Sequence, residues 1–311
     1  MDVLVTGGAG FIGANLCRRL VGTDEIDRVV VLDDFSTGFR SNLDGVAVEL
    51  VEGTFLDAAT LDRCALGCDA IVHLGARPSV PRSIADPLAS HDANATGTLQ
   101  VLEAARRAGD AHVVVASSSS VYGSNPTLPK HEDLATRPLS PYAASKLAAE
   151  SYALAYGSSY GLPTLAFRFF NVFGPLQAAG HAYAAVVPAF VSAALRGEPL
   201  VVHGDGHQSR DFTFVDTVTA VLADAVVRTV TSPCPVNLAF GTRTTLLELI
   251  AAVESALGRP VERDHVERRV GDVDHSQASN ARLRALFPDV RPAPLEEGLA
   301  RTIDWFRSLP A

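Results

Sequence analysis

Cysteine, long apolar runs and positive charge are all scarce in this sequence of 311 residues. The four cysteines form no Cys-x-x-Cys pair, so we expect free thiols and no metal site. No apolar run reaches the roughly 18 residues of a membrane helix, and no basic segment precedes the first strand pattern. The net charge of -9 argues against a nucleic-acid partner, which requires a basic footprint. These absences predict a cytoplasmic enzyme that is not bound to a membrane.

Lysine is scarcer still, with two residues against 24 arginines. One of them, Lys146, stands four residues after Tyr142 in the segment Ser140-Pro-Tyr-Ala-Ala-Ser-Lys146. Ser140 is a typical N-cap and Pro141 a typical first helical residue, so the tyrosine and the lysine should lie one turn apart on one helix face. A compact ammonium on a flexible stem is suited to reach between a phenol and a sugar hydroxyl. The pattern predicts a tyrosine that acts as a base.

The remaining composition, 47% hydrophobic and 20% charged, is that of a globular chain with a large core. Its first half alternates short β-branched runs with helical patterns, which predicts an α/β fold with a doubly wound parallel sheet of the Rossmann type. We expect strands at 2–5, 28–32, 47–51, 69–74, 112–117 and 164–169. We expect helices at 11–22, 60–65, 92–108 and 142–159.

The second half of the chain is less regular after about residue 170. It has the pattern of a smaller C-terminal α/β lobe, which caps a substrate and shares one strand, near 235–239, with the main sheet. Helices are expected at 184–196, 216–229, 246–257, 279–286 and 295–307.

A glycine-rich segment, Gly7-x-x-Gly10-x-x-Gly13, lies between the first strand and the first helix, where a dinucleotide fingerprint belongs. Gly7 and Gly10 would let the backbone approach a pyrophosphate, and Gly13 would let helix and strand pack closely. Asp33 ends the second strand, 20 residues after Gly13, where its carboxylate can bind ribose hydroxyls and would repel a 2′-phosphate. The pattern favours NAD over NADP; the alternative is that Asp33 and Asp34 are ordinary turn residues.

A run of serines, Ser117-Ser-Ser-Ser120, follows a buried strand and would place hydroxyls at the carboxyl edge of the sheet. Alone it could be a polar loop, but beside Tyr142 and Lys146 it predicts a hydrogen bond to a reacting sugar oxygen. The pKa of a phenol is about 10, so a base at neutral pH needs it lowered by roughly 3, or about 4 kcal/mol. We expect the Lys146 ammonium and an oxidised nicotinamide ring to supply this lowering.

Over nearly its whole length the chain resembles an extended short-chain dehydrogenase/reductase. Within that group it resembles the NAD-dependent nucleotide-sugar 4-epimerases of the UDP-glucose/UDP-N-acetylglucosamine type. The motifs that carry the resemblance are Gly7-x-x-Gly10-x-x-Gly13, Asp33, His73-Leu-Gly-Ala76, Asn94, Ser117-Ser-Ser-Ser-Val-Tyr-Gly123, Tyr142-x-x-x-Lys146, Arg168-Phe-Phe-Asn171-Val-Phe-Gly-Pro175, Gly204-Asp-Gly-x-x-x-Arg210-Asp-Phe212 and Gly271-Asp-Val-x-x-Ser276.

The resemblance implies a catalytic set of Ser118, Tyr142 and Lys146. Tyr142 would take the proton of the C4 hydroxyl while hydride passes to NAD, and Lys146 would hold the nicotinamide ribose. The 4-keto sugar would then turn about its diphosphate link and take hydride on its other face. A strong, remote anchor for the nucleotide is therefore required.

The resemblance also implies the binding residues. The NAD contacts would come from Gly7, Gly10, Phe11, Ile12, Gly13, Asp33, Asp34, Ser36, Thr37, Gly38, Thr54, Phe55, Leu74, Gly75, Ala76, Asn94, Ser117, Tyr142 and Lys146. The UDP-sugar contacts would come from Ser79, Val80, Arg82, Ser118, Ser119, Tyr142, Phe170, Asn171, Val187, Arg210, Arg269, Asp272 and Ser276. Alone, Arg210 or Arg269 would be read as a solvated surface charge. His73 is expected to be a structural residue at a strand end.

Domain boundaries and assembly also follow from the resemblance. An NAD-binding domain would span 1–170 and about 212–240, and a nucleotide-sugar-binding lobe would span 171–211 and 241–311. The helices near 92–108 and 142–159 have small, apolar faces that pair across a homodimer interface in the family, although core packing explains such faces equally well.

The choice of reaction and sugar depends on a few positions. Ser119 and Ser120 replace the acidic pair of related dehydratases, and Asn171 stands where glucuronate epimerases tend to carry threonine. Ser276 falls at a gatekeeper position and leaves room for an N-acetyl group. We expect 4-epimerisation of UDP-glucose/UDP-galactose and of UDP-GlcNAc/UDP-GalNAc. The alternatives are a UDP-glucuronate 4-epimerase, another reductase, decarboxylase or dehydratase of this scaffold, and a non-catalytic NAD sensor, which would be expected to lose the catalytic set.

The sequence departs from the family pattern after the third strand, where Gly53-Thr54 replaces the usual Gly-Asp. Thr54 cannot offer a carboxylate to the adenine amino group. Adenine binding is therefore looser than in the family, or it rests on backbone groups around Phe55 and on Asp57.

Overall fold

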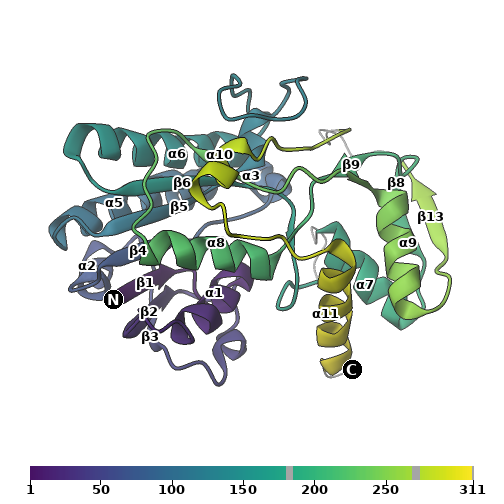
Figure 1. Ribbon diagram of the computed structural model, residues 1–311, viewed down its shortest axis with the longest axis horizontal. Coiled ribbons are helices and arrows are strands. Elements are labelled where there is room, and N and C mark those ends of the chain that lie inside the picture. Colours follow the sequence, from purple (N-terminus) through teal and green to yellow (C-terminus); the bar gives the residue numbers. More distant parts are fainter. Residues whose placement is uncertain (180–184, 268–273, 310–311) are drawn as a thin grey trace.

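The computed structural model describes residues 1–179, 185–267 and 274–309 (Figure 1). Its centre is a seven-stranded sheet with the order β11-β6-β5-β4-β1-β2-β3, in which every pair of neighbouring strands is parallel. This is the doubly wound Rossmann-type sheet that the sequence predicts. The strands are β1 (Asp2–Thr6), β2 (Arg28–Asp33), β3 (Glu49–Glu52), β4 (Ala70–His73), β5 (His112–Ser118), β6 (Thr164–Phe169) and β11 (Val236–Leu238).

Helices cover both faces of this sheet, because alternate residues of each buried strand point to opposite sides. Val3 and Val5 pack with α1 (Phe11–Val21) and α8 (Val215–Val227), whereas Leu4 between them packs with helices of the other face. The helices of that other face are α2 (Ala58–Ala65), α5 (Gly97–Arg107) and α6 (Pro141–Tyr160). Both faces of the sheet are therefore apolar, and polar ligands can meet it only at an edge.

A smaller group of elements follows β6 and lies to the right in Figure 1. Its apolar core joins α7 (Val186–Arg196), α9 (Leu246–Leu257) and α11 (Leu295–Ser308). Parallel pairing of β8 (Leu200–His203) with β13 (Arg263–Val266) completes it. Two short pairs connect this group to the sheet: β7 (Val172–Phe173) with β10 (Thr213–Phe214), and β9 (Ser209–Arg210) with β12 (Thr244–Thr245).

The predicted elements agree with the structure apart from a few boundaries. The helix expected at 92–108 begins as a π-helical turn, η2 (Asp92–Thr96), before α5. The helix expected at 216–229 ends at Val227, and α10 (Ala281–Leu286) starts two residues later than expected. The helix expected from 184 is described from Val186, and residue 184 itself lies outside the described residues. Two short helices, α3 (Val80–Ala85) and α4 (Pro87–His91), were not predicted.

All four cysteines are free thiols. Within the described ranges, no helix combines the length and apolar character that crossing a bilayer requires. The same ranges contain no group of three or more His, Cys, Asp or Glu side chains arranged to hold a metal ion.

Gly13 provides a test of the close packing between β1 and α1. A Cβ added there would lie 2.2 Å from the carbonyl oxygen of Gly7, a contact that only backbone movement could relieve. We expect Gly13→Ala to lower the free energy of unfolding by about 2 kcal/mol, as overpacking typically does. Urea denaturation followed by circular dichroism measures this change.

The matched control is Gly22→Ala at the other end of α1, where φ is -95° and an added Cβ would lie 3.6 Å from the nearest atom. This variant should stay within about 0.5 kcal/mol of the parent protein. Equal stability of the two variants would show that the tight turn at Gly13 is not needed for the fold.

Candidate active site

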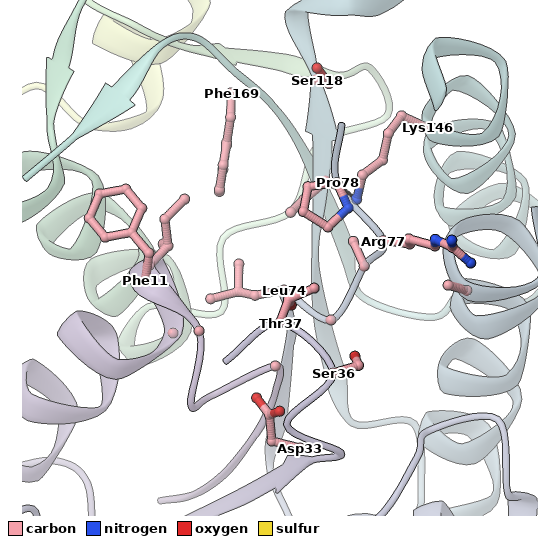
Figure 2. A pocket seen from close by; sticks show the side chains of 18 of the residues that line it. Phe11, Asp33, Ser36, Thr37, Leu74, Arg77, Pro78, Ser118, Lys146 and Phe169 are labelled. Carbon is pink, nitrogen blue, oxygen red and sulfur yellow. Dashed lines mark hydrogen bonds between the residues drawn. The ribbon is translucent and has the colours of Figure 1, made fainter. Parts of the chain in front are cut away.

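A cleft of about 770 Å³ opens at the carboxyl ends of the central strands, where doubly wound sheets bind their ligands (Figure 2). Most predicted NAD contacts line this first cleft, and so does Ser118. In Figure 2, Asp33 lies at one end of the cleft, and Ser118 and Lys146 lie at the other. The predicted cofactor residues that line it are Gly7, Gly10, Phe11, Ile12, Gly13, Asp33, Asp34, Ser36, Thr37, Thr54, Phe55, Leu74, Gly75, Ala76, Ser117, Tyr142 and Lys146.

The glycine-rich turn has the geometry of a phosphate cradle. Gly7 has φ of +70°, and a Cβ there would lie 2.7 Å from the backbone nitrogen of Gly75 at the end of β4. Gly10 is the N-cap of α1, so the unpaired N–H groups and the positive end of that helix face the cleft. A pyrophosphate can approach this backbone closely because no side chain projects from these glycines.

Asp33 offers a carboxylate whose orientation is already fixed. Its Oδ2 accepts a hydrogen bond from the N–H of Ala9 at 2.9 Å, and its Oδ1 accepts one from Phe35 at 2.8 Å. Burial raises the pKa of Asp33, and these two N–H groups work in the opposite direction. Each oxygen keeps a further lone pair for a ribose hydroxyl. The glycine turn and this acceptor together fit the diphosphate and the ribose of an adenosine diphosphate.

Phe55 lines the first cleft, and its ring packs against the backbone of two glycines. A Cβ at Gly75 would lie 2.5 Å from its ring, and a Cβ at Gly97 would lie 2.3 Å from it. Thr54 lines the cleft too, and its hydroxyl accepts the N–H of Leu56. Asp57, the other candidate for adenine binding, caps α2 and is not among the lining residues.

Tyr142 and Lys146 occupy consecutive turns of α6, as the sequence predicts. Ser140 is the N-cap, and its hydroxyl accepts the N–H of Ala143 at 3.2 Å. Lys146 is buried, and its ammonium donates to the carbonyl oxygen of Ala116 on β5 at 2.8 Å. The helix start therefore fixes the phenol and the amine over the end of β5.

The pKa of Tyr142 differs in direction from the sequence-based expectation. Burial raises the pKa of this phenol, and the hydroxyl of Ser118 lowers it only in part. Burial also lowers the pKa of the Lys146 amine to about 8, so the amine remains mostly protonated at pH 7. The lowering expected from Lys146 together with an oxidised nicotinamide ring concerns the site with its cofactor bound and stays a prediction.

Ser118 ends β5 and caps the short 3-10 helix η3 (Ser119–Tyr122). Its Oγ accepts the N–H of Ser120 at 3.1 Å and contacts the Ser120 hydroxyl at 2.8 Å. This cap holds the catalytic candidate at the cleft and turns the chain away from the sheet. Ser119 follows it but does not line the cleft.

A second cleft, of about 680 Å³, adjoins the first and belongs to the smaller group of elements. Asn171, Val172 and Gln177 line both clefts, so the two are neighbours. Four of the predicted substrate contacts besides Asn171 line the second cleft: Ser79, Val80, Val187 and Arg210. Two others, Arg82 and Phe170, line the first.

The remaining predicted contacts are placed elsewhere. Asn94 is buried and holds the loop after β4, because its Oδ1 accepts the N–H of Arg77 at 2.8 Å. Gly38 packs against the backbone of Ala9. Ser276 lies outside both linings, and its N–H donates to the carbonyl of Ser209 at 3.0 Å. Arg269 and Asp272 lie outside the described residues.

Sequence reasoning missed several residues that line the clefts. Arg77 and Pro78 directly follow the predicted Ala76, and Phe169 directly precedes the predicted Phe170, so contiguity could have identified them. Gln177 carried no such signal, and the apolar residues of the second cleft were not singled out, although Phe173 and Phe212 stand in the quoted motifs and Val186 directly precedes the predicted Val187. Those apolar residues include Phe173, Val186, Phe190, Phe212 and Leu246.

His73 is a structural residue, in agreement with its sequence-based interpretation. It is buried between the hydroxyls of Thr6 at 2.7 Å and Thr98 at 3.1 Å. Burial, assisted by the charge of Lys146, lowers the pKa of His73 to about 3, so the ring is neutral at pH 7.

Comparisons with known proteins agree with this geometry. A UDP-glucose 4-epimerase from Mycolicibacterium smegmatis is 38% identical over 318 residues, with 99% of each chain covered. A UDP-N-acetylglucosamine 4-epimerase from Methanobrevibacter ruminantium, solved in complex with UDP-N-acetylmuramic acid, superposes with a TM-score of 0.92 at 34% identity, covering 99% and 98% of the two chains. A UDP-glucuronic acid 4-epimerase from Bacillus cereus, solved with UDP-glucuronic acid and NAD, has a TM-score of 0.90 at 27% identity and 99% coverage of each chain.

The family model described as "NAD dependent epimerase/dehydratase family" matches residues 3–238, which contain the first cleft and the catalytic candidates. NAD is accordingly the cofactor of this family, and the geometry of the glycine turn and of Asp33 is compatible with it. The chain belongs to the NAD dependent epimerase/dehydratase family.

Proposed function

We propose that this chain is a UDP-sugar 4-epimerase that interconverts UDP-glucose and UDP-galactose, and also UDP-GlcNAc and UDP-GalNAc, through a 4-keto sugar. One observation carries the proposal: Tyr142, Lys146 and Ser118 line the first cleft where it adjoins a second cleft that can hold a nucleotide. Such a layout suits a reaction at a sugar that stays attached to its nucleotide.

In this mechanism Tyr142 takes the proton of the C4 hydroxyl, and Ser118 hydrogen-bonds the same oxygen. Bound NAD would supply the hydride acceptor at C4 and the positive ring that favours the Tyr142 phenolate, and the same hydride would be restored to the opposite face of the sugar. Lys146 contributes a positive charge and binds the ribose of the cofactor. Since burial raises the pKa of Tyr142, proton removal depends on the cationic partners being close.

Rotation of the keto sugar requires an anchor that is remote from C4. Arg210 and Asn171 in the second cleft are proposed to bind the diphosphate and the nucleotide ribose, because a guanidinium matches phosphate oxygens. The proposed roles of Arg269 and Asp272 in the same anchor stay predictions. The gatekeeper candidate Ser276 donates its N–H to the carbonyl of Ser209, which is the residue before Arg210.

We also propose that two parts of the chain bind the cofactor and the substrate separately. Residues 1–170 with about 212–240 would bind NAD, because they contain the glycine turn, Asp33 and the central sheet. Residues 171–211 and 241–311 would bind the nucleotide sugar, because they supply most of the second cleft. The homodimer stays a prediction.

A second candidate is a UDP-glucuronate 4-epimerase. The guanidinium side chains of Arg77 and Arg82 both line the first cleft, where either could meet a sugar carboxylate. Arg77 is already paired with Asp86 at 3.0 Å, so Arg82 is the stronger candidate. The rates of UDP-glucuronate and UDP-glucose turnover, measured by proton NMR on the purified protein, decide between the two candidate functions.

Tyr142 is the proposed base of the reaction. We expect Tyr142→Phe to lower kcat for UDP-glucose by about 1,000-fold, because the phenol that removes the C4 proton is lost. Proton NMR of the UDP-glucose and UDP-galactose mixture measures the rate. No net NADH should accumulate during turnover of the parent protein, since the cofactor is restored in each cycle.

The matched control is Tyr152→Phe on the same helix, where the side chain is 41% exposed and distant from the cleft linings. It should retain the parent rate. Full activity in Tyr142→Phe would overturn the mechanism, and steady NADH release would favour a reductase or decarboxylase.

The next prediction concerns the choice of sugar. We expect the parent protein to convert UDP-GlcNAc to UDP-GalNAc, and Ser276→Tyr to lower this kcat/KM at least about tenfold while UDP-glucose turnover is kept. The reason is steric: Ser276 lines neither cleft, but it pairs with Ser209 next to Arg210, and we expect the longer tyrosine side chain to extend from there into the space needed by an N-acetyl group. The gatekeeper interpretation is wrong if the parent protein turns over UDP-glucose and leaves UDP-GlcNAc unchanged.

A further inference from the structure

A buried carboxylate lies beside the catalytic residues without lining either cleft. Glu150 stands four residues after Lys146 on α6, so Tyr142, Lys146 and Glu150 form one stripe on the helix face that meets the sheet. Below it, Ser117 on β5 and Arg168 on β6 are directly opposite in register. The helix and the two strands therefore bring three polar side chains to one point inside an apolar core.

The contacts among these three side chains are short and fully directional. Arg168 donates to Glu150 through Nε at 2.9 Å and through Nη2 at 2.6 Å. The hydroxyl of Ser117 donates to Oε2 of Glu150 at 2.7 Å, and a carboxylate can only accept. The Arg168 and Glu150 side chains are 4% and 3% exposed. The Ser117 hydroxyl is thus committed to Glu150, although its residue lines the first cleft.

Two successive side chains of the helix stripe hold two successive residues of β5. Lys146 binds the carbonyl of Ala116, and Glu150 binds the hydroxyl of Ser117. The next residue is Ser118. The end of the strand is therefore tied to α6 immediately before the catalytic serine.

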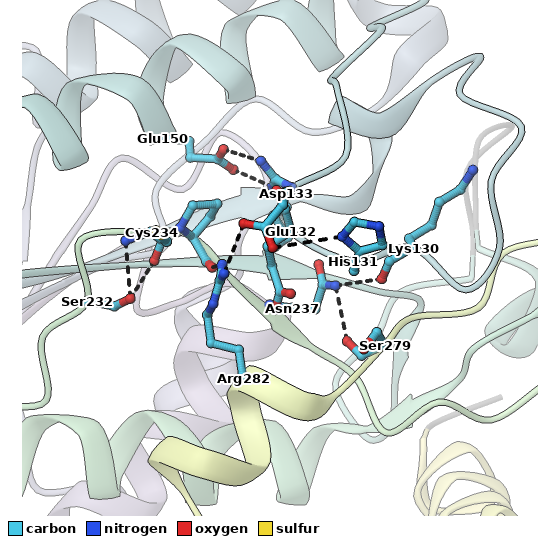
Figure 3. A network of polar contacts seen from close by, with 12 residues as sticks. Lys130, His131, Glu132, Asp133, Glu150, Ser232, Cys234, Asn237, Ser279 and Arg282 are labelled. Carbon is cyan, nitrogen blue, oxygen red and sulfur yellow. Dashed lines mark hydrogen bonds and ion pairs between the residues drawn. The ribbon is translucent and has the colours of Figure 1, made fainter.

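Arg168 is itself held from its far side. Its Nη1 donates to the carbonyl of Glu132 at 3.2 Å, and its guanidinium lies 4.6 Å from the centre of the Tyr122 ring. Asn237, opposite Arg168 on β11, accepts the Tyr122 hydroxyl at 2.7 Å. The Asn237 amide donates to the carbonyls of Lys130 and Ser279 (Figure 3). The cation therefore has little freedom to follow Glu150 if that carboxylate moves.

A buried ion pair is weak evidence of stabilisation, because desolvation of two charges offsets most of their attraction. Apolar side chains of similar volume could fill the same space. What apolar side chains could not supply is a directed acceptor for Ser117 at the end of β5. The geometry is therefore better explained by positioning than by stability.

We propose that Glu150 is a positioning residue whose carboxylate, fixed by Arg168, holds the Ser117 hydroxyl and thereby sets the place of Ser118 relative to Tyr142 and Lys146. The proposal rests on the proposed function, since it concerns how that active site is kept in its reactive geometry. It assigns to Glu150 no contact with substrate or cofactor.

The main test is Ser117→Ala, which removes one hydrogen bond and leaves the Glu150–Arg168 pair intact. We expect kcat for UDP-glucose to fall about tenfold, because small displacements of reacting groups are costly. KM should stay within about twofold, and the melting temperature and NAD content should match the parent protein. A purely structural role would lower the melting temperature without this separation of kcat from KM.

The matched control is Tyr156→Phe on the same helix. It also removes one hydrogen bond to a carboxylate, from the Tyr156 hydroxyl to Oε1 of Glu103 at 2.6 Å, on a contact with α5 rather than β5. Its kcat and KM should be those of the parent protein. Glu150→Gln keeps the shape but leaves Arg168 uncompensated, so it should lose more kcat than Ser117→Ala and also melt at a lower temperature.

A second readout does not depend on substrate. The phenolate absorbance of Tyr142 is titrated as the difference between each protein and the same protein carrying Tyr142→Phe. The Ser118 hydroxyl lowers the pKa of Tyr142, so displacement of Ser118 in Ser117→Ala should move the titration to higher pH. Tyr156→Phe should leave the titration unchanged.

Measuring both kcat and the Tyr142 titration distinguishes a failure of the proposed function from a failure of the positioning role of Glu150. If the parent protein turns over no UDP-sugar but the titration shifts in Ser117→Ala, the proposed function fails and the positioning role stands. If the parent protein is an active epimerase, and Ser117→Ala changes neither kcat nor the titration, the positioning role is overturned. An unchanged titration in an inactive parent protein overturns it as well.

Discussion

The contact between helix α6 and the end of strand β5 determines where everything else in the site lies. It is made by charged groups inside an apolar core, and buried charges require partners with fixed geometry. The Lys146 ammonium satisfies this need on a backbone carbonyl that no substitution can remove. Because β5 lies between β4 and β6 in the sheet, its end adjoins the ends of both neighbours, and the residues at or just after those ends, Leu74 and Phe169, line the same cleft. The rest of the site is arranged around this contact between α6 and β5.

Burial acts against the proposed role of Tyr142 as a base. Burial raises the pKa of Tyr142, and Ser118 is the side chain that opposes this. Lys146 keeps its proton at pH 7 because its pKa falls only to about 8. The protein therefore holds a neutral phenol beside a cation, and proton removal becomes favourable when further positive charge is close. Proton removal from Tyr142 is therefore favoured when the cofactor is bound, and it is disfavoured when the site is empty.

Local patterns predicted the central sheet and the first cleft well, because hydrophobic period, the glycine turn and the Ser140-Pro141 helix start are all short-range signals. The direction of the Lys146 side chain could not be predicted from the sequence. It depends on whether the ammonium lies nearer to the phenol of Tyr142 or to the carbonyl oxygen of Ala116 in three dimensions. The role of Glu150 was also missed, since its partners Ser117 and Arg168 meet it only after three elements pack. The short strands β7, β9, β10 and β12 escaped detection because two residues carry no period. The placements of Arg269 and Asp272, outside the described residues, stay predictions.

Phe55 has a consequence for how this chain can diverge. Its ring lies against two backbone positions, Gly75 and Gly97, that are far from it in sequence and would each collide with it if they gained a side chain. A substitution at either glycine is therefore tolerated only after the ring at position 55 becomes smaller, and a smaller residue there would leave a void until a glycine is replaced. We therefore expect related chains that carry a side chain at position 75 or 97 to have a smaller residue at position 55.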